Sequence, residues 1–101
     1  MRLTSLEVDT IRQAVLKHFG ENAVVTLFGS RTMDSRRGGD IDLLVESDLG
    51  PDERFRKKLE TLTELQLALG DQKIDLLTVC PGSVDDAQSV VREARQHGVR
   101  L

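Results

Sequence analysis

The stretch VVTLFGSRTMDSRRGGDIDLLV, residues 24–45, decides the fold. Two apolar runs rich in Val and Leu, typical of buried strands, flank a loop that contains glycine and arginine. The second run opens with Asp40 and Asp42, one residue apart. Two carboxylates at the start of a strand that otherwise favours burial need a physical reason, because an unpaired charge is costly to bury.

Helical and strand patterns alternate through the rest of the chain. Thr4 lies three residues before Glu7, which is the spacing of a capping box, and apolar residues follow at near-helical intervals until Gly20. Comparable start and stop signals recur further on. They predict helices over about residues 5–19, 51–69 and 83–97 and strands over about 23–28, 40–46 and 73–79.

Strands and helices that mix within 101 residues indicate one domain, over residues 1–101, in which helices flank a small mixed β-sheet. The predicted class is α/β (α+β). The stretches DIDLLV and KIDLLTV resemble one another. We interpret them as neighbouring strands of one sheet rather than as a duplication.

The composition limits the classes of function. Apolar residues make up 39% and charged residues 31%, which is typical of a soluble globular chain. The net charge of −3 and the absence of Trp and Tyr argue against direct nucleic-acid binding. The single cysteine, Cys80, excludes an internal disulfide and a cysteine-based zinc site. No apolar run is long enough to span a membrane, so we expect a cytoplasmic protein.

The first two acids fall on one face of their predicted strand. Side chains alternate along a strand, so Asp40 and Asp42 project to the same side while Ile41 and Leu43 project to the other. Carboxylates this close repel each other unless a cation lies between them. Oxygen ligands of this kind suit Mg²⁺ or Mn²⁺.

A third acid, Asp75, interrupts the apolar run KIDLLTV as Asp42 interrupts DIDLLVE. If the two strands are neighbours in register, Asp75 completes a cluster of three carboxylates. Two structural alternatives remain open. Asp40 follows Gly-Gly and can be an ordinary turn residue, and Asp75 can be a buried partner of an arginine.

The loop after the first strand has features of a phosphate site. Gly29 lets a ligand approach the backbone, and a helix that begins at Ser30 or Arg31 would offer free N–H groups to an anion. Arg31 adds positive charge, although a solvated loop arginine is the alternative. Neither a Walker signature nor a dinucleotide fingerprint is present.

The helix expected over about 51–69 carries an apolar stripe, and we predict that its members belong to the core: Phe55, Leu59, Leu62 and Leu65. Leu67 is a surplus leucine on the same helix and is a candidate for a partner interface.

Gly29-Ser30, nine further residues and then Asp40-Ile41-Asp42 resemble the signature of the DNA polymerase β-like nucleotidyltransferase superfamily. Asp75 falls where that superfamily has its third acid. The short length resembles the minimal nucleotidyltransferases, the MNT proteins, in which the interval is usually slightly longer. The resemblance covers about residues 20–80.

The resemblance implies a role for each matching residue. The residues implied to bind the phosphates of ATP are Gly29, Ser30 and Arg31, and those implied to be catalytic and to hold two Mg²⁺ ions are Asp40, Asp42 and Asp75. The implied reaction is transfer of AMP from ATP with release of pyrophosphate. Two metal ions would stabilise the attacking and leaving oxygens of such an in-line displacement.

The resemblance also implies a partner. MNT proteins are typically paired with a HEPN-domain toxin, which they modify with AMP on a tyrosine hydroxyl, so they act as antitoxins by AMPylation within a hetero-oligomer. Only 22 residues follow Val79, and we expect no separate acceptor domain in them. Two alternatives remain: a non-catalytic antitoxin that blocks its partner by contact, and the nucleotidyltransferase subunit of a two-chain enzyme that modifies small molecules such as aminoglycosides.

Overall fold

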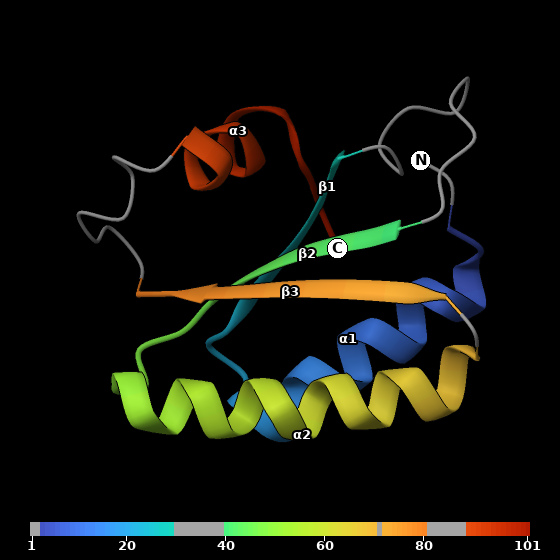
Figure 1. Cartoon of the computed structure of the whole chain (residues 1–101), viewed down its shortest axis with the longest axis horizontal. Coiled ribbons are helices and arrows are strands. Elements are labelled where there is room, and N and C mark those ends of the chain that lie inside the picture. The colour runs from blue at the N-terminus through green and yellow to red at the C-terminus, as the bar shows by residue number, and fades with distance from the viewer. Residues whose placement is uncertain (1–2, 30–39, 71, 81–88) are drawn as a thin grey trace.

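The computed structural model describes residues 3–29, 40–70, 72–80 and 89–101. These residues form a four-stranded mixed sheet in the order β3-β2-β1-β4 with three helices (Figure 1). The elements in chain order are α1 (Ser5–Phe19), β1 (Val24–Phe28), β2 (Asp40–Glu46), α2 (Pro51–Leu69), β3 (Lys73–Val79), α3 (Ser89–His97) and β4 (Val99–Arg100). The predicted α/β class, with helices flanking a small mixed sheet, is confirmed.

Local signals in the sequence set the ends of the first helix. The backbone N–H of Glu7 donates to Thr4 Oγ1 at 3.1 Å, and the Thr4 N–H donates to Glu7 Oε1 at 2.9 Å, so the predicted capping box is present. At the other end the Gly20 N–H donates to the Leu16 carbonyl. Such caps satisfy backbone groups that a helix end otherwise leaves without partners.

The two strands with similar sequences are neighbours. β2 and β3 run parallel and in register, from Asp40 opposite Lys73 to Glu46 opposite Val79. Parallel strands need a crossover connection, and α2 supplies it. β1 lies on the side of β2 that is opposite β3. It pairs antiparallel with β2 and, along its other edge, antiparallel with β4.

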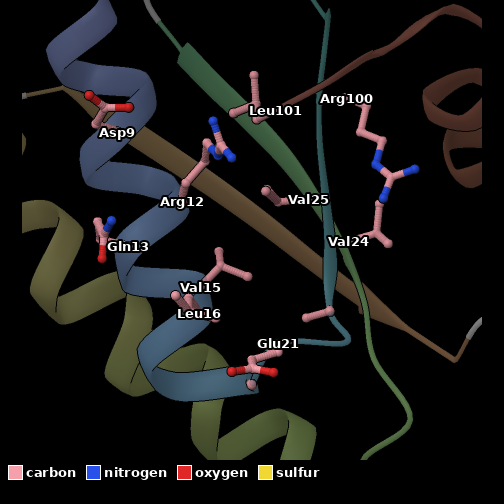
Figure 2. A pocket seen from close by; sticks show the side chains of 12 residues that line it. Asp9, Arg12, Gln13, Val15, Leu16, Glu21, Val24, Val25, Arg100 and Leu101 are labelled. Carbon is pink, nitrogen blue, oxygen red and sulfur yellow. The ribbon is translucent and has the colours of Figure 1, made fainter.

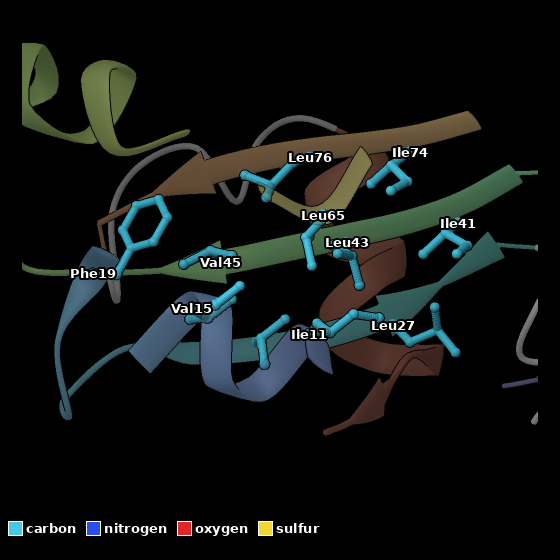
Figure 3. Packing of buried hydrophobic residues seen from close by; sticks show 12 residues of the cluster. Ile11, Val15, Phe19, Leu27, Ile41, Leu43, Val45, Leu65, Ile74 and Leu76 are labelled. Atoms are coloured by element: carbon cyan, nitrogen blue, oxygen red, sulfur yellow. The ribbon is translucent and has the colours of Figure 1, made fainter. Parts of the chain in front are cut away.

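One face of the sheet packs on α1 and α2 and forms the main core (Figure 3). Side chains from both helices meet alternate residues of the three longer strands, and the fully buried ones include Ile11, Leu27, Ile41, Leu43 and Leu65. Burying each such side chain contributes about 1.5–3 kcal/mol. This face therefore supplies most of the hydrophobic stabilisation.

The opposite face is covered by α3. Val91 and Ala94 pack on Phe28, Leu44 and Val79. Arg95 of the same helix pairs with Glu46 on β2, with 3.4 Å between Nη2 and Oε2. Figure 1 shows α3 above the end of the sheet where β2 and β3 finish. The end where these two strands begin is not under this helix.

Two sequence expectations for the core were wrong. Phe55 and Leu59 are 60% and 48% exposed, although Leu65 is fully buried and Leu62 is half-buried as the stripe predicted. α2 lies beside β3, which is the last strand of the described sheet, so no described element covers the outer part of the stripe. Leu67 is 84% exposed.

Other differences concern the end of the chain. The two-residue strand β4 was not expected, and its pairing is extended by the Leu101 N–H, which donates to the Val25 carbonyl at 3.0 Å. The predicted cap at Ser83 lies outside the described residues, and the described part of the last helix begins at Ser89. No helix in the described ranges has the length and apolar character needed to cross a bilayer.

Charged side chains join α1 to α2 outside the core. Glu64 accepts hydrogen bonds from Lys17 Nζ and His18 Nε2, both at 3.0 Å, and Glu60 lies 3.4 Å from His18 Nδ1. The hydrogen bond from Lys17 is the main cause of a lowered pKa at Glu64, followed by that from His18. The carboxylate form is therefore the one that the folded state favours.

This pairing predicts a loss of stability in acid. The pKa of Glu64 is lower in the folded state than its ordinary value of 4.5. The stabilisation that Glu64 gives the folded state is therefore complete above pH 4.5 and is lost as the pH falls through the pKa of the folded state. The difference in free energy of unfolding between wild type and Glu64→Gln should shrink as the pH falls. Urea denaturation at about pH 7 and about pH 3 measures it. A difference that stays constant between the two pH values would contradict the assignment.

Gly98 allows the end of α3 to approach β1. A β-carbon at this position would collide with the carbonyl oxygen of Ala94 and would lie 2.5 Å from Thr26 Cγ2 and 2.9 Å from the Leu27 carbonyl oxygen. Gly98→Ala should lower the free energy of unfolding by about 1–3 kcal/mol, since backbone atoms must move. Urea denaturation tests this. Gly50→Ala is the control because a β-carbon there meets nothing within 4 Å, and equal losses in both variants would refute the explanation.

Candidate active site

Two of the predicted acids stand side by side on the sheet. Asp42 on β2 and Asp75 on β3 are Cα partners in the parallel register. Neighbouring strands lie about 4.8 Å apart, and residues in register project to the same face. Asp42 is half-buried and Asp75 is exposed. The structure therefore places these two carboxylates on adjacent strands, at a part of the sheet that solvent reaches.

Gly29 lies directly against this pair. It follows Phe28, which is the partner of Asp42 on β1, and it has a positive φ of 80°. A β-carbon at position 29 would collide with Asp42 Oδ2 and would lie 3.2 Å from Asp42 Cγ. Glycine is needed here for two reasons: its backbone conformation is one that other residues rarely adopt, and the carboxylate occupies the space of a side chain.

The two acids line an open groove with a volume of about 450 Å³, which we call the β3 groove. Its walls come from three strands and from α2. The lining residues are Phe28, Asp42, Lys58, Leu62, Ile74, Asp75, Leu76 and Leu77. Apart from the two acids and one lysine, this surface is apolar.

The other predicted site residues are placed only in part. Asp40 begins β2 opposite Lys73, two residues before Asp42, and its side chain lies outside the described part of the structure. Ser30 and Arg31 also lie outside the described residues. Among the described side chains, no group of three acids, histidines or cysteines could hold a metal ion. The structure thus brings together Asp42 and Asp75 of the expected three acids.

The donor chemistry of this pair fits a divalent cation. Like charges on directly opposite strand positions destabilise a sheet, and a cation between them removes that repulsion. Carboxylate oxygens are the ligands that Mg²⁺ and Mn²⁺ prefer, and Mg²⁺ is commonly held by one or two carboxylates together with substrate phosphates. Asp42 and Asp75 are therefore the described residues that could hold such an ion.

A second pocket lies away from the acids (Figure 2). It has a volume of about 390 Å³ and is formed by α1, the start of β1 and the end of the chain. Its charges have both signs, from Asp9, Glu21, Arg12 and Arg100. Of the predicted site residues, those that the structure describes with their side chains (Gly29, Asp42 and Asp75) do not line it, and its mixed charge favours no particular ligand.

Lys58 is a groove residue that the sequence analysis did not single out. It lies on α2 within the basic run Arg56-Lys57-Lys58, where nothing distinguishes it by residue type. Its spacing to Leu62 is the one available signal. Residues four apart share a helix face, so the lysine that precedes a half-buried leucine by one turn points toward the same groove.

Comparison with known proteins agrees with this geometry. The family model described as a nucleotidyltransferase domain matches residues 8–100, which include Gly29, Asp42 and Asp75. Domains of this family generally use a nucleoside triphosphate and a divalent metal ion, which suits two adjacent carboxylates. A search of curated proteins finds no match. The chain belongs to the nucleotidyltransferase domain family.

Proposed function

We propose that this protein transfers AMP from ATP to a hydroxyl group, with tyrosine of a HEPN-domain toxin as the acceptor, and so acts as the antitoxin of that partner. The observation that carries the chemistry is the pairing of Asp42 with Asp75 beside Gly29. The identity of the partner rests on the resemblance to minimal nucleotidyltransferases. Exposed Phe55 and Leu67 on α2 are apolar side chains of the kind that protein interfaces cover.

In this proposal the residues of the chain position the reactants. Asp42 and Asp75, with Asp40 as the third acid, hold Mg²⁺, which neutralises charge on the phosphates when bound. The Gly29 corner keeps the backbone close to the acids, with Ser30 and Arg31 beyond it assigned to the triphosphate. The acceptor oxygen forms a bond to the α-phosphorus while the bond from that phosphorus to the pyrophosphate oxygen breaks. The carboxylate of Asp75, exposed at the groove, can take the hydroxyl proton.

The proposal places this activity in the cytoplasm. ATP is the nucleotide donor, and Cys80 is a free cysteine, which suits a reducing compartment. Transfer to a protein acceptor would make the working form a hetero-oligomer, at least transiently.

The first test removes one carboxylate. Asp42→Asn keeps the size of the side chain but weakens its binding to a cation. We expect transfer of labelled AMP from ATP to a HEPN-domain partner to fall by more than about 100-fold. The reason is that mutation of a group that only supports a metal ligand already lowers metal affinity or activity by about 10–100-fold. The readout is incorporated label and the mass of the modified partner.

Asp48→Asn, at an exposed position after β2, is the control and should retain activity. A variant that has lost transfer should still show the unfolding curve of a folded protein. Neutralisation of the toxin by Asp42→Asn as effective as that by wild type would refute the enzymatic account and favour a contact antitoxin.

The second test concerns the Gly29 corner. Gly29→Ala should lower both stability and AMP transfer, because the added carbon displaces the Asp42 carboxylate and the positive φ strains any other residue. Gly70→Ala is a matched control, since Gly70 has the same φ of 80° but open space around a β-carbon. That variant should lose about 1 kcal/mol or more of stability and keep its activity. Equal activity in the two variants, measured at a temperature where both are folded, would show that the contact with Asp42 is unimportant.

A further inference from the structure

The β3 groove touches four consecutive residues of one strand, Ile74 to Leu77. Consecutive side chains of a strand point to opposite faces of the sheet. A groove that reaches all four therefore runs along the outer edge of the strand, past side chains that belong to both faces. β3 is the last strand of the described sheet, so no described strand pairs with this edge.

The two sides of this edge differ in chemistry. On one side lie the acids, Asp42 and Asp75. On the other side Ile74 and Leu76 join the main core, and α2 adds Leu62 and Lys58 to the wall. One side is suited to a reacting hydroxyl, and the other is suited to apolar side chains next to one positive charge.

Lys58 gives this wall of the groove a positive charge. Its side chain is half-buried, and it forms no ion pair with any residue in the described ranges, whereas Arg56 and Lys57 pair with Glu53 and Glu60, each at 3.5 Å. A positive group held over an apolar surface favours an acceptor with a negative charge. It repels a polycation, since like charges brought together at an interface are unfavourable.

We infer that the β3 groove is the acceptor subsite and that it takes an extended acidic polypeptide segment, which adds to the sheet along β3. This inference rests on the proposed function and deepens it. A residue opposite Asp75 presents its hydroxyl to the two acids. Its immediate neighbours in the segment point to the other face and pack on Leu62 and Ile74, and a carboxylate further along that face meets Lys58.

Strand addition explains why the acceptor can be a protein rather than a small sugar. Main-chain hydrogen bonds along an open edge supply affinity, and alternate side chains supply specificity. Exposed Phe55 and Leu59, one turn apart on α2, can extend the apolar wall beyond Leu62. An aminoglycoside carries several positive charges, whereas the charged residues among the described lining of the groove are two carboxylates, both already assigned to the metal, and a lysine.

The test compares defined acceptors for AMP transfer from labelled ATP with Mg²⁺. The first is a peptide in which valine flanks a tyrosine on both sides and a glutamate lies three residues from the tyrosine in each direction. Because residues an odd number of positions apart on a strand project to opposite faces, the glutamates project to the face of Lys58 when the tyrosine projects to the face of the acids. The second has lysines in place of the glutamates, and the third acceptor is kanamycin. We expect wild type to prefer the acidic peptide over the basic one by about tenfold or more in kcat/KM.

Lys58→Glu should cancel or reverse that preference without weakening the binding of MgATP, measured calorimetrically with a nonhydrolysable analogue. Lys57→Glu makes the same change of charge one residue away, outside the groove lining, and should keep the preference. A reversal confined to position 58 is a readout that a structural role for this lysine would not produce.

The outcomes separate this inference from the proposed function. If the protein binds MgATP but modifies kanamycin best, modifies none of the three acceptors, or shows the same peptide preference in Lys58→Glu, the acceptor assignment is wrong and the nucleotide site stands. If wild type fails to bind MgATP, the proposed function itself is refuted. Preference for the acidic peptide that depends on Lys58 supports both.

Discussion

The parallel register of β2 and β3 is the constraint on which the site depends. It sets Asp42 opposite Asp75, a placement that is unfavourable in itself because both carboxylates are negative. The register is held from the other face, where Ile41 is opposite Ile74 and buried in the core. A shift by one residue would turn every such side chain toward solvent. The hydrophobic core therefore keeps together two acids that would otherwise move apart.

The unequal covering of the two faces then leaves the acids accessible. α1 and α2 both lie on the face that carries Leu43, whereas the described part of α3 covers Phe28, Leu44 and Val79 on the other face. The acids lie on the same face as α3, toward the beginning of the parallel strands, where Asp75 is exposed and Asp42 is half-buried. The described part of α3 therefore leaves both carboxylates within reach of solvent.

The sequence alone predicted the features that depend on a local pattern of residues or on two similar stretches. The ends of α1 follow from Thr4 and Gly20, and the likeness of DIDLLV to KIDLLTV predicted neighbouring strands, from which the pairing of Asp42 with Asp75 follows. Strand β4 could not be predicted, because two residues have no period and its pairing depends on a tertiary approach at Gly98. The place of Lys58 likewise depends on where α2 lies over the sheet edge.

The wrong expectation for Phe55 has the same cause as the open groove. A helix stripe as wide as that of α2 needs a sheet that extends beneath all of it, and the sheet formed by the described residues stops at β3. Open edges promote aggregation, and proteins commonly protect them with charged side chains. Lys73 and Asp75 are both exposed on this strand, so the edge carries such charges. Asp75, which lies opposite Asp42, therefore also helps to discourage non-specific pairing along β3.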